Sequence, residues 1–288
     1  MKKILLLVLL AACALVFSGE NTSSVKICIL GSCAGTEPQK GRHHTAWLLQ
    51  TGSKLYQFDA GENCAYTAHL AGYDLSQLRA IFISHPHQDH VSGLPHLVMV
   101  RNKLASARFK RKMAVKPLPI YTPIPTLVTG LQDFLTATTC GRYDYRSGTN
   151  ITGKTVRDGK FFDDQTLSVE ALHNRHCGDP DKTGQWFSFS YKITVNGKKI
   201  VYSGDIRRLE EMSPFLRDCD LLLMENGHHK PWQVAEKIRQ TPAWKVKRLI
   251  FLHHGRSVLN TPEETARKTE KAWGKPAEFA VDGMTLML

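Results

Sequence analysis

The stretch "ISHPHQDHVSGLP", residues 83–95, places three histidines and one aspartate within six positions, directly after the apolar segment "RAIFI". A histidine in a protein interior needs partners for its ring nitrogens, and a metal ion satisfies several imidazoles and a carboxylate at once. Zinc and similar first-row ions are bound by this mixture of nitrogen and oxygen ligands. The stretch therefore predicts a metal centre at the end of a β-strand, with further ligands supplied from elsewhere in the chain.

Polar residues follow three other strand-like segments in the same way. "SVEAL" precedes His173 and His176, "IVYSG" precedes Asp205, and "RLIFL" precedes His253 and His254. Side chains at strand ends on one edge of a sheet converge in space although they are distant in sequence. We therefore expect residues from these segments to complete the metal centre.

Strand patterns alternate with helical patterns in both halves of the chain. Apolar and β-branched segments predict strands at 25–31, 46–50, 54–60, 79–84, 118–123, 167–172, 187–195, 198–204, 220–224, 248–253 and in the C-terminal "EFAVDG". Helical patterns cover 62–72, 94–105, 124–138, 206–217, 232–240 and 262–273. The Asn196-Gly197 pair predicts a tight turn that joins two strands in a hairpin. No linker divides the chain, so the pattern predicts sheets covered by helices in one domain.

The first residues have the composition of an export signal. "MKK" is followed by about 14 apolar residues, fewer than the roughly 20 that an ordinary spanning helix needs. Two processing routes fit residues 1–18: cleavage near Ser18, or lipidation of Cys13 in the lipobox-like "LAAC"; the alternative to both is an uncleaved N-terminal anchor. Either route predicts a bacterial protein outside the cytoplasm, in the periplasm or held on a membrane by a lipid anchor.

The cysteines do not form a metal-binding pattern. Without Cys13, six remain, and no C-x-x-C pair occurs among them. A thiolate zinc site is therefore disfavoured. An exported protein can form disulfides, but buried free thiols are the favoured expectation.

The motifs together resemble the metallo-β-lactamase superfamily, and within it the ribonuclease Z and phosphodiesterase-like branch. Beside residues 83–95, the resemblance is carried by "ILGSCAGTEPQKGRHHTAWLL", "LYQFDAGEN", "VEALHNRH", "VYSGD" and "LIFLHH". It implies an α/β fold, a four-layer αββα sandwich of two mixed β-sheets flanked by helices. Residues 24–288 would form this single hydrolase domain, with the site along one edge of the two sheets.

The resemblance also implies a set of metal ligands. Two divalent ions are expected, with zinc favoured over manganese or iron. One ion would be held by His85, His87 and His176, and the other by Asp89, His90 and His253. Asp205 would bridge them. The family's spacing favours His176 over His173, and ungapped comparison favours His253 over the rival His254.

A protein with this set of metal ligands is expected to be a hydrolase. Two cations close together lower the pKa of a shared water, and the resulting hydroxide attacks a phosphorus or carbonyl centre. Asp89 is expected to orient that nucleophile as well as to bind metal, and Asp59 to fix an imidazole ring. His228 is the candidate proton donor to the leaving group and His229 a candidate substrate-binding residue, the alternative being a loop pair that faces solvent. His43 and His44 are weaker candidates, because they can simply flank a strand.

Charge and the departures from ribonuclease Z narrow the expected substrate. The net charge of +12 favours an anionic substrate, and the basic stretch 101–116 either contacts it or is a solvated helix face. No segment has the composition of the long arm that grips transfer RNA, and "MENG" at 224–227 replaces the "HEAT" signature. We expect a phosphodiesterase acting on a small anionic or nucleotide-type molecule, without a stable nucleic-acid partner.

Other functions stay open on the same scaffold. Hydrolysis of a lactone, a sulfate ester or a β-lactam would use the same metals, although an aspartate at position 205 argues against the cysteine-ligand type of zinc β-lactamase. The alternative from another class is a surface lipoprotein that binds a metal or ligand without turnover. Association as a homodimer is compatible with the sequence.

Overall fold

The computed structural model describes residues 24–35, 37–108 and 116–288. The expected export signal, with Cys13 and Ser18, and residues 109–115 of the basic stretch 101–116 lie outside the described residues. Within the described part, no helix combines the length and the apolar character that crossing a bilayer requires. The described cysteines are unpaired; Cys140 is exposed, Cys177 is half-buried, and the other four are buried, as expected for free thiols.

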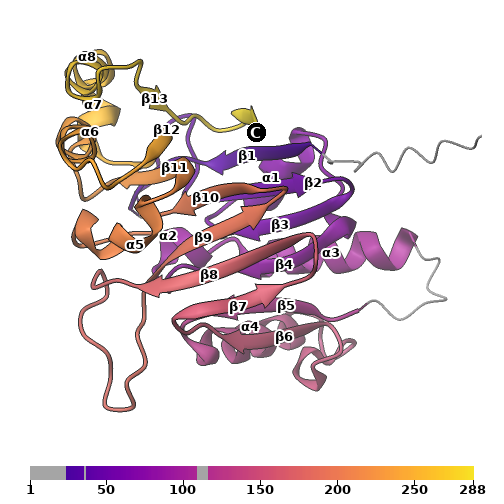
Figure 1. Cartoon of the computed structure of the whole chain (residues 1–288). Helices are drawn as coiled ribbons and strands as arrows, with labels where there is room; N and C mark the ends of the chain where they lie inside the picture. The colour runs from indigo at the N-terminus through magenta and orange to yellow at the C-terminus, as the bar shows by residue number, and fades with distance from the viewer. Residues whose placement is uncertain (1–23, 36, 109–115) are drawn as a thin grey trace, which may run out of the picture.

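Two seven-stranded sheets form the centre of the molecule (Figure 1). The first has the order β14-β1-β2-β3-β4-β5-β6, with strands Val25–Gly31 (β1), Ala46–Thr51 (β2), Lys54–Phe58 (β3), Leu78–Phe82 (β4), Leu118–Thr122 (β5), Ile151–Thr155 (β6) and Thr285–Met287 (β14). The second has the order β13-β12-β11-β10-β9-β8-β7, with strands Gly159–Asp163 (β7), Leu167–His173 (β8), Phe189–Val195 (β9), Lys198–Tyr202 (β10), Cys219–Asn226 (β11), Val246–His254 (β12) and Glu278–Phe279 (β13). Both sheets mix parallel and antiparallel pairs, as predicted.

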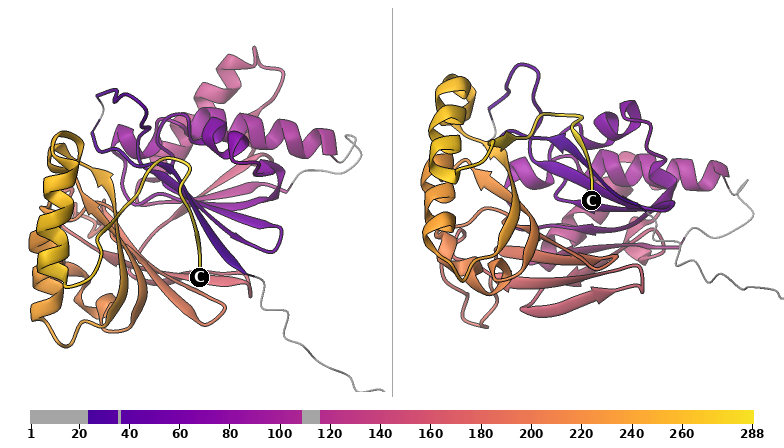
Figure 2. Two further views of the ribbon diagram at one scale, coloured as in Figure 1. Left: turned by 90° about the horizontal axis from the view of Figure 1, so that it is seen from above. Right: turned by 45° about the horizontal axis from the view of Figure 1, so that its top comes forward.

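Helices cover the outer face of each sheet, which gives four layers (Figure 2). The first sheet is covered by Cys64–Leu70 (α1), Leu94–Arg108 (α3) and Pro125–Thr138 (α4). The second is covered by Ser213–Leu216 (α5), Pro231–Gln240 (α6) and Pro262–Trp273 (α8). Two short helices, Gln88–Val91 (α2) and Arg256–Asn260 (α7), follow directly on strand ends. The predicted αββα sandwich is confirmed.

The central strands are largely apolar because both of their faces are buried. In β1, Ile27 and Ile29 pack between the sheets, whereas Cys28 and Leu30 pack against the helices. Successive side chains of a strand point to opposite faces, so a strand in a middle layer needs no polar face. Between the sheets, aromatic rings fill the core, with Trp47 stacked on Phe58 at 4.1 Å between centroids.

Local sequence signals account for most of the elements. The Asn-Gly turn joins β9 to β10, with Val195 opposite Lys198, and both turn residues have positive φ, 46° at Asn196 and 71° at Gly197. The helix expected at 206–217 is instead a 3₁₀ helix, Leu209–Met212, followed by the four-residue α5. Pro214 lies in the first turn of α5, where its missing N–H costs nothing, and it would interrupt a longer helix.

Three strands were not predicted. β6, β7 and β14 are short and lie toward the edges of the sheets, and β7 has no buried residue. Edge strands gain their hydrogen bonds from one neighbour and need no apolar pattern, so sequence periodicity does not reveal them.

Candidate metal centre

Four strands of the two sheets end at one rim, and the predicted ligands follow three of them. His85, His87, Asp89 and His90 come after β4, in the turn that leads into α2 and in α2 itself. His176 lies in the loop after β8, Asp205 follows β10, and His253 is the penultimate residue of β12. The two sheets are joined at this rim by a backbone hydrogen bond from the Phe189 N–H to the Ser84 carbonyl, 3.0 Å.

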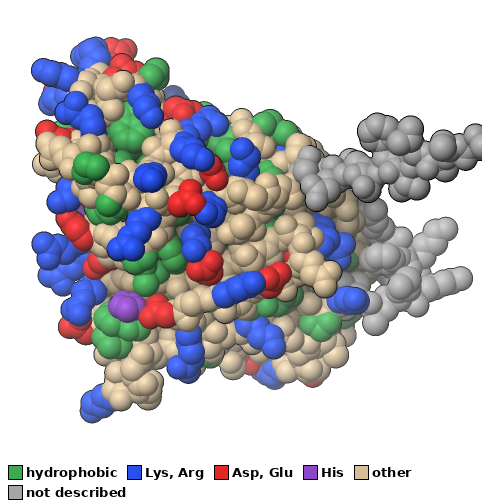
Figure 3. Space-filling model, viewed as in Figure 1, with side chains coloured by type: hydrophobic (Ala, Val, Ile, Leu, Met, Phe, Trp, Pro, Cys, Tyr) green, Lys and Arg blue, Asp and Glu red, His purple; other side chains and the backbone are tan. Residues whose placement is uncertain are grey.

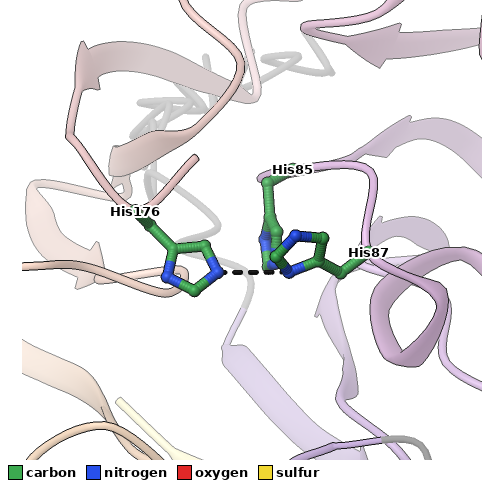
Figure 4. Close-up of side chains that lie close together, drawn as sticks. All are labelled: His85, His87 and His176. Atoms are coloured by element: carbon green, nitrogen blue, oxygen red, sulfur yellow. Dashed lines mark hydrogen bonds between the residues drawn. The ribbon is translucent and has the colours of Figure 1, made fainter. Parts of the chain in front are cut away.

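The first set of ligands converges from opposite sides of the rim. Figure 4 shows the His176 ring facing those of His85 and His87. His176 Nε2 lies 3.2 Å from His87 Nδ1, and one ligand atom from each of the three residues falls within 4.8 Å of the others. The predicted first triad is thus assembled by residues about ninety positions apart.

The second set lies beside it, with Asp205 between the two. Asp89, His90 and His253 also present ligand atoms within 4.8 Å of one another. Asp205 carboxylate oxygens lie 3.4 Å from His90 Nε2 and 3.1 Å from His253 Nε2 in this set. Toward the first set they lie 3.7 Å from His85 Nε2 and 3.6 Å from His176 Nε2. Asp205 therefore occupies the position that a bridging ligand requires.

Unsatisfied buried atoms show that this donor set fits cations. His85 Nε2, His90 Nε2 and Asp205 Oδ1 are buried and have no hydrogen-bond partner among the described residues. Buried polar atoms are nearly always paired, so three orphans in one cluster indicate a bound group that accepts their lone pairs. Burial, together with the neighbouring His90, holds the pKa of the His85 imidazole well below its ordinary value, and burial lowers that of His176 to about 4. Neutral imidazole is the form that binds a metal.

Oxygen atoms behind the rings fix which nitrogen faces the cluster. His90 Nδ1 lies 2.8 Å from Asp59 Oδ2, His253 Nδ1 lies 2.6 Å from Thr45 Oγ1, and His85 Nδ1 lies 3.0 Å from Ser84 Oγ. The Thr45 and Ser84 hydroxyls donate elsewhere, to the Cys33 carbonyl and to Asp59, so they accept from the imidazoles. Each of the three rings therefore keeps its proton on Nδ1 and presents a free Nε2 to the cluster.

Asp59 is the centre of this supporting network. It is fully buried and accepts hydrogen bonds from the Ser84 N–H (2.7 Å), the Ser84 hydroxyl (2.7 Å) and the Tyr202 hydroxyl (2.6 Å), besides its contact with His90. Its φ of 48° is unusual for a residue other than glycine. The expected contact of Asp59 with an imidazole is present, whereas the support from Thr45, Ser84 and Tyr202 was not anticipated, since hydroxyl residues carry no motif.

Glu211 ties together the two loops of the second sheet that carry ligands. One carboxylate oxygen accepts the N–H of Arg175, the residue before His176, at 3.3 Å. The other accepts the N–H groups of Arg207 (3.2 Å) and Arg208 (3.1 Å), which follow Asp205. Sequence reasoning missed Glu211, because nothing near it in sequence marks its contact with the His176 loop.

His254 and His173, the alternatives to His253 and His176 as metal ligands, have other partners. His254 lies 2.7 Å from the Ala280 carbonyl and 3.0 Å from the Asn226 amide, outside the cluster. His173 contacts Asp158 at 2.7 Å and stacks on Trp186. The geometry thus favours His253 and His176.

His43 and His44 are outside the cluster as well. His44 is bound to Glu62 at 2.6 Å, and His43 contacts the Asn63 amide at 3.4 Å. Neither belongs to a described group of metal-ligand atoms.

His228 reaches the cluster, and His229 lies behind it. His228 Nδ1 is 3.3 Å from Glu225 and 3.7 Å from Asp205, and its side chain is 45% exposed. The hydrogen bond to Glu225 raises the pKa of His228 to about 9. His229 also lines the cavity, but its Nε2 already contacts the Ile206 carbonyl at 3.1 Å.

Gly227, in the "MENG" segment, makes room for His253. A Cβ at position 227 would lie 2.8 Å from the His253 ring and 2.9 Å from Ala34. His253 itself has a φ of 54°, which turns its side chain away from the regular course of β12.

A cavity of about 730 Å³ opens from the cluster. Its described lining includes His87, Asp89, His176, Asp205 and His253, together with α7 and the loop after β1. Charge on the rest of the surface is less informative: Figure 3 shows basic side chains over the whole face that it displays, with acidic ones between them.

Comparisons with known proteins identify relatives of the chain. A protein-family model described as "Anti-Pycsar protein Apyc1" matches residues 25–269. Ribonuclease Z of Picrophilus torridus is 25% identical over 284 aligned positions, which cover 81% of this chain and 86% of that protein.

Solved structures share the fold. The metallo-β-lactamase fold protein YhfI of Bacillus subtilis superposes with a TM-score of 0.66 and 18% identity, covering 92% of this chain and all of that one. The short form of human tRNase Z gives a TM-score of 0.61 and 22% identity, covering 91% and 98%. The architecture is therefore the metallo-β-lactamase fold.

Proposed function

The chain belongs to the anti-Pycsar protein Apyc1 family and is a metal-dependent hydrolase, and we propose that it cleaves a phosphodiester bond in a small, anionic, nucleotide-type molecule. The proposal includes two divalent ions, zinc being the favoured metal. The observation that carries it is the pair of ligand sets arranged around Asp205, with orphaned ligand atoms in both. Two ions held there would supply Lewis acidity and an activated water.

We assign the ligands to two sets. His85, His87 and His176 would hold one ion, Asp89, His90 and His253 the other, and Asp205 both. Asp59, Thr45 and Ser84 keep the Nε2 atoms of His90, His253 and His85 free for this.

Asp89 and His228 are the proposed catalytic residues beside the metals. Asp89 Oδ2 accepts the Gly35 N–H at 2.9 Å, which fixes the carboxylate and lets it orient an attacking water. His228 projects into the same cavity, and Glu225 at 3.3 Å holds its imidazole in place. We assign His228 the delivery of a proton to the leaving oxygen, because its ring reaches the cluster without being buried in it.

The cavity supports a small substrate. Its volume lies within the roughly 300–1,000 Å³ of ordinary small-molecule sites. A net charge of +12 adds a general attraction for anions.

Metal analysis and turnover of bis(4-nitrophenyl) phosphate test the proposal. We expect two metal ions per chain and diester hydrolysis that is lost in His87→Ala and Asp89→Ala. His173→Ala is the matched control, a histidine close to a ligand loop but outside the cluster, and it should behave as wild type. Metal without turnover of any ester would favour the non-catalytic binding protein, and activity on lactones, sulfate esters or β-lactams alone would replace the phosphodiesterase.

Location is part of the proposal and rests on the first residues of the sequence. We propose export, either with cleavage near Ser18 or with lipidation of Cys13. The mass of the mature protein, isolated from its own membranes or periplasm, distinguishes the two routes, and an unprocessed N-terminus in the cytoplasm would contradict both.

A further inference from the structure

Three arginines line a second cavity, outside the metal centre. Arg175, Arg207 and Arg208 surround a hollow of about 500 Å³, and they make up the whole of its described lining. We call these three residues the arginine group. None of them lines the cavity that opens from the metal ligands, so the proposed function does not use them.

Glu211 holds the backbone of the whole arginine group. Its carboxylate oxygens accept the N–H groups of Arg175 (3.3 Å), Arg207 (3.2 Å) and Arg208 (3.1 Å). Arg175 lies in the loop between β8 and β9, whereas Arg207 and Arg208 follow β10, so the three residues meet only in the tertiary structure. One carboxylate thus fixes the points from which three guanidinium side chains extend around one hollow.

The positive charge of the arginine group is only partly offset. Arg175 is paired with Asp179 at 2.5 Å, and its guanidinium carbon lies 5.6 Å from the centre of the Trp186 ring. The side chains of Arg207 and Arg208 are exposed. Within the part of the chain that the structure describes, neither guanidinium forms an ion pair or donates a hydrogen bond. Two cations of the group therefore have no carboxylate partner.

This arrangement suits a phosphate dianion. A guanidinium donates two parallel N–H groups to phosphate oxygens, and it stays charged at every physiological pH. Guanidinium groups gathered around one hollow repel one another, and a dianion between them replaces that repulsion by attraction. An apolar ligand would find nothing to pack against in a lining of three cations.

We propose that the arginine group binds a phosphate dianion, free or as a phosphomonoester, and that the bound anion joins the loops that carry His176 and Asp205. Arg175 directly precedes His176, and Arg207 is the second residue after Asp205. An anion that contacts both loops holds them together from the side-chain side, as Glu211 does from the backbone side. Binding of the anion and binding of metal therefore favour each other. The anion site is independent of the proposed function, whereas its coupling to metal rests on the proposed ligands.

Calorimetric titration of the metal-loaded full chain with inorganic phosphate tests the site. The wild type should bind one phosphate at the arginine group besides any phosphate at the metals, and Arg207→Ala/Arg208→Ala should bind one fewer. Both substitutions retain the backbone N–H groups that Glu211 accepts. Arg239→Ala/Arg267→Ala, which removes the same charge from exposed positions on α6 and α8, is the matched control and should keep the wild-type number of sites. Equal numbers of bound phosphates in the two double variants would overturn the proposal.

Two further titrations define the chemistry of the site. Arg207→Lys/Arg208→Lys keeps the charge but lacks the planar fork, so the affinity of the arginine group for phosphate should fall about tenfold, the size of one lost charge-assisted hydrogen bond. Glycerol 2-phosphate distinguishes the two sources of the anion. Its binding at the arginine group would show that a phosphomonoester is accepted, and binding of inorganic phosphate alone would assign the site to the free ion.

Metal retention tests the coupling between the two sites. Metal affinity, measured by competition with a chelator, should rise by up to about tenfold at a phosphate concentration ten times the dissociation constant, the limit for an anion that binds only the metal-loaded chain. Arg207→Ala/Arg208→Ala should show a smaller rise, and an equal rise would overturn the coupling. Neither measurement needs turnover, so phosphate bound at the arginine group of a chain that cleaves no diester would refute the phosphodiesterase alone.

Discussion

The two sides of the cavity are built in different ways. The ligand side draws its residues from both sheets, between residues 85 and 253, and three of its five imidazole rings are supported by buried hydroxyl or carboxylate oxygens. The outer wall of the cavity, formed by the five-residue α7 and the short loop after β1, presents mostly polar side chains that are half-buried or exposed. The first arrangement stabilises a fixed geometry, whereas the second can change with little cost to the fold. Substitutions on the ligand side should therefore reduce metal binding and activity together, whereas substitutions on the outer wall should change KM and leave metal content unaltered.

The largest effect is expected from Asp205→Ala. It removes the carboxylate that lies within 3.7 Å of four ligand imidazoles and leaves the two ligand sets without a shared group. Activity should fall by at least ~100-fold, and elemental analysis should show less than two metals per chain. Asp158→Ala is the matched control, because Asp158 contacts the non-ligand His173. Two metal ions per chain in Asp205→Ala would contradict the proposal that Asp205 bridges the ions.

Asp59→Asn should have the next largest effect. The carboxylate accepts four hydrogen bonds, and an amide can accept fewer while placing an N–H against donors. Metal affinity, measured by competition with a chelator, should fall about 10–100-fold. Asp164→Asn is the control, since Asp164 accepts a similar bond from the Tyr56 hydroxyl, 2.6 Å, at a site without ligands. Equal metal affinity in the two variants would contradict the supporting role.

Glu211→Ala tests the tie between the His176 and Asp205 loops. Three backbone N–H groups lose their acceptor, so the loops should separate and metal affinity should fall by roughly tenfold. Glu211→Gln retains one accepting oxygen and should recover part of the loss. Glu210→Ala, which removes only a surface pair with Lys237, should have no effect on metal affinity. A loss of stability without a loss of metal affinity would make Glu211 purely structural.

Asn260→Ala should have the smallest effect, and only on the outer wall. We expect KM for the phosphodiester substrate to rise by about threefold to tenfold, the range of one neutral hydrogen bond, with wild-type metal content. A fall in metal content would show that the two sides of the cavity are not independent.

Much of the ligand side could be predicted because its residues are marked locally. Histidine clusters after strand-like segments are rare enough to be noticed, and they mark His85, His87 and His90 directly, whereas His176 was preferred to His173 through the family's spacing. The choice between His253 and His254 could not be made by spacing alone. It depends on a positive φ at His253 and on the space left by Gly227, neither of which has a sequence signature.

The sequence by itself predicted sheets covered by helices in one domain, a metal centre after the strand at 79–84 and the Asn-Gly hairpin, because hydrophobic periodicity, ligand type and turn chemistry are local properties. The four-layer sandwich and the division of the ligands into two sets were implied by the family resemblance. Only the tertiary structure decided which oxygen supports each imidazole, that Glu211 joins two ligand loops, and that α7 faces the cavity. These facts depend on contacts between residues far apart in the chain. Hydroxyl and carboxylate side chains take such roles wherever packing places them, so no pattern in the sequence distinguishes them from the same residues on the surface.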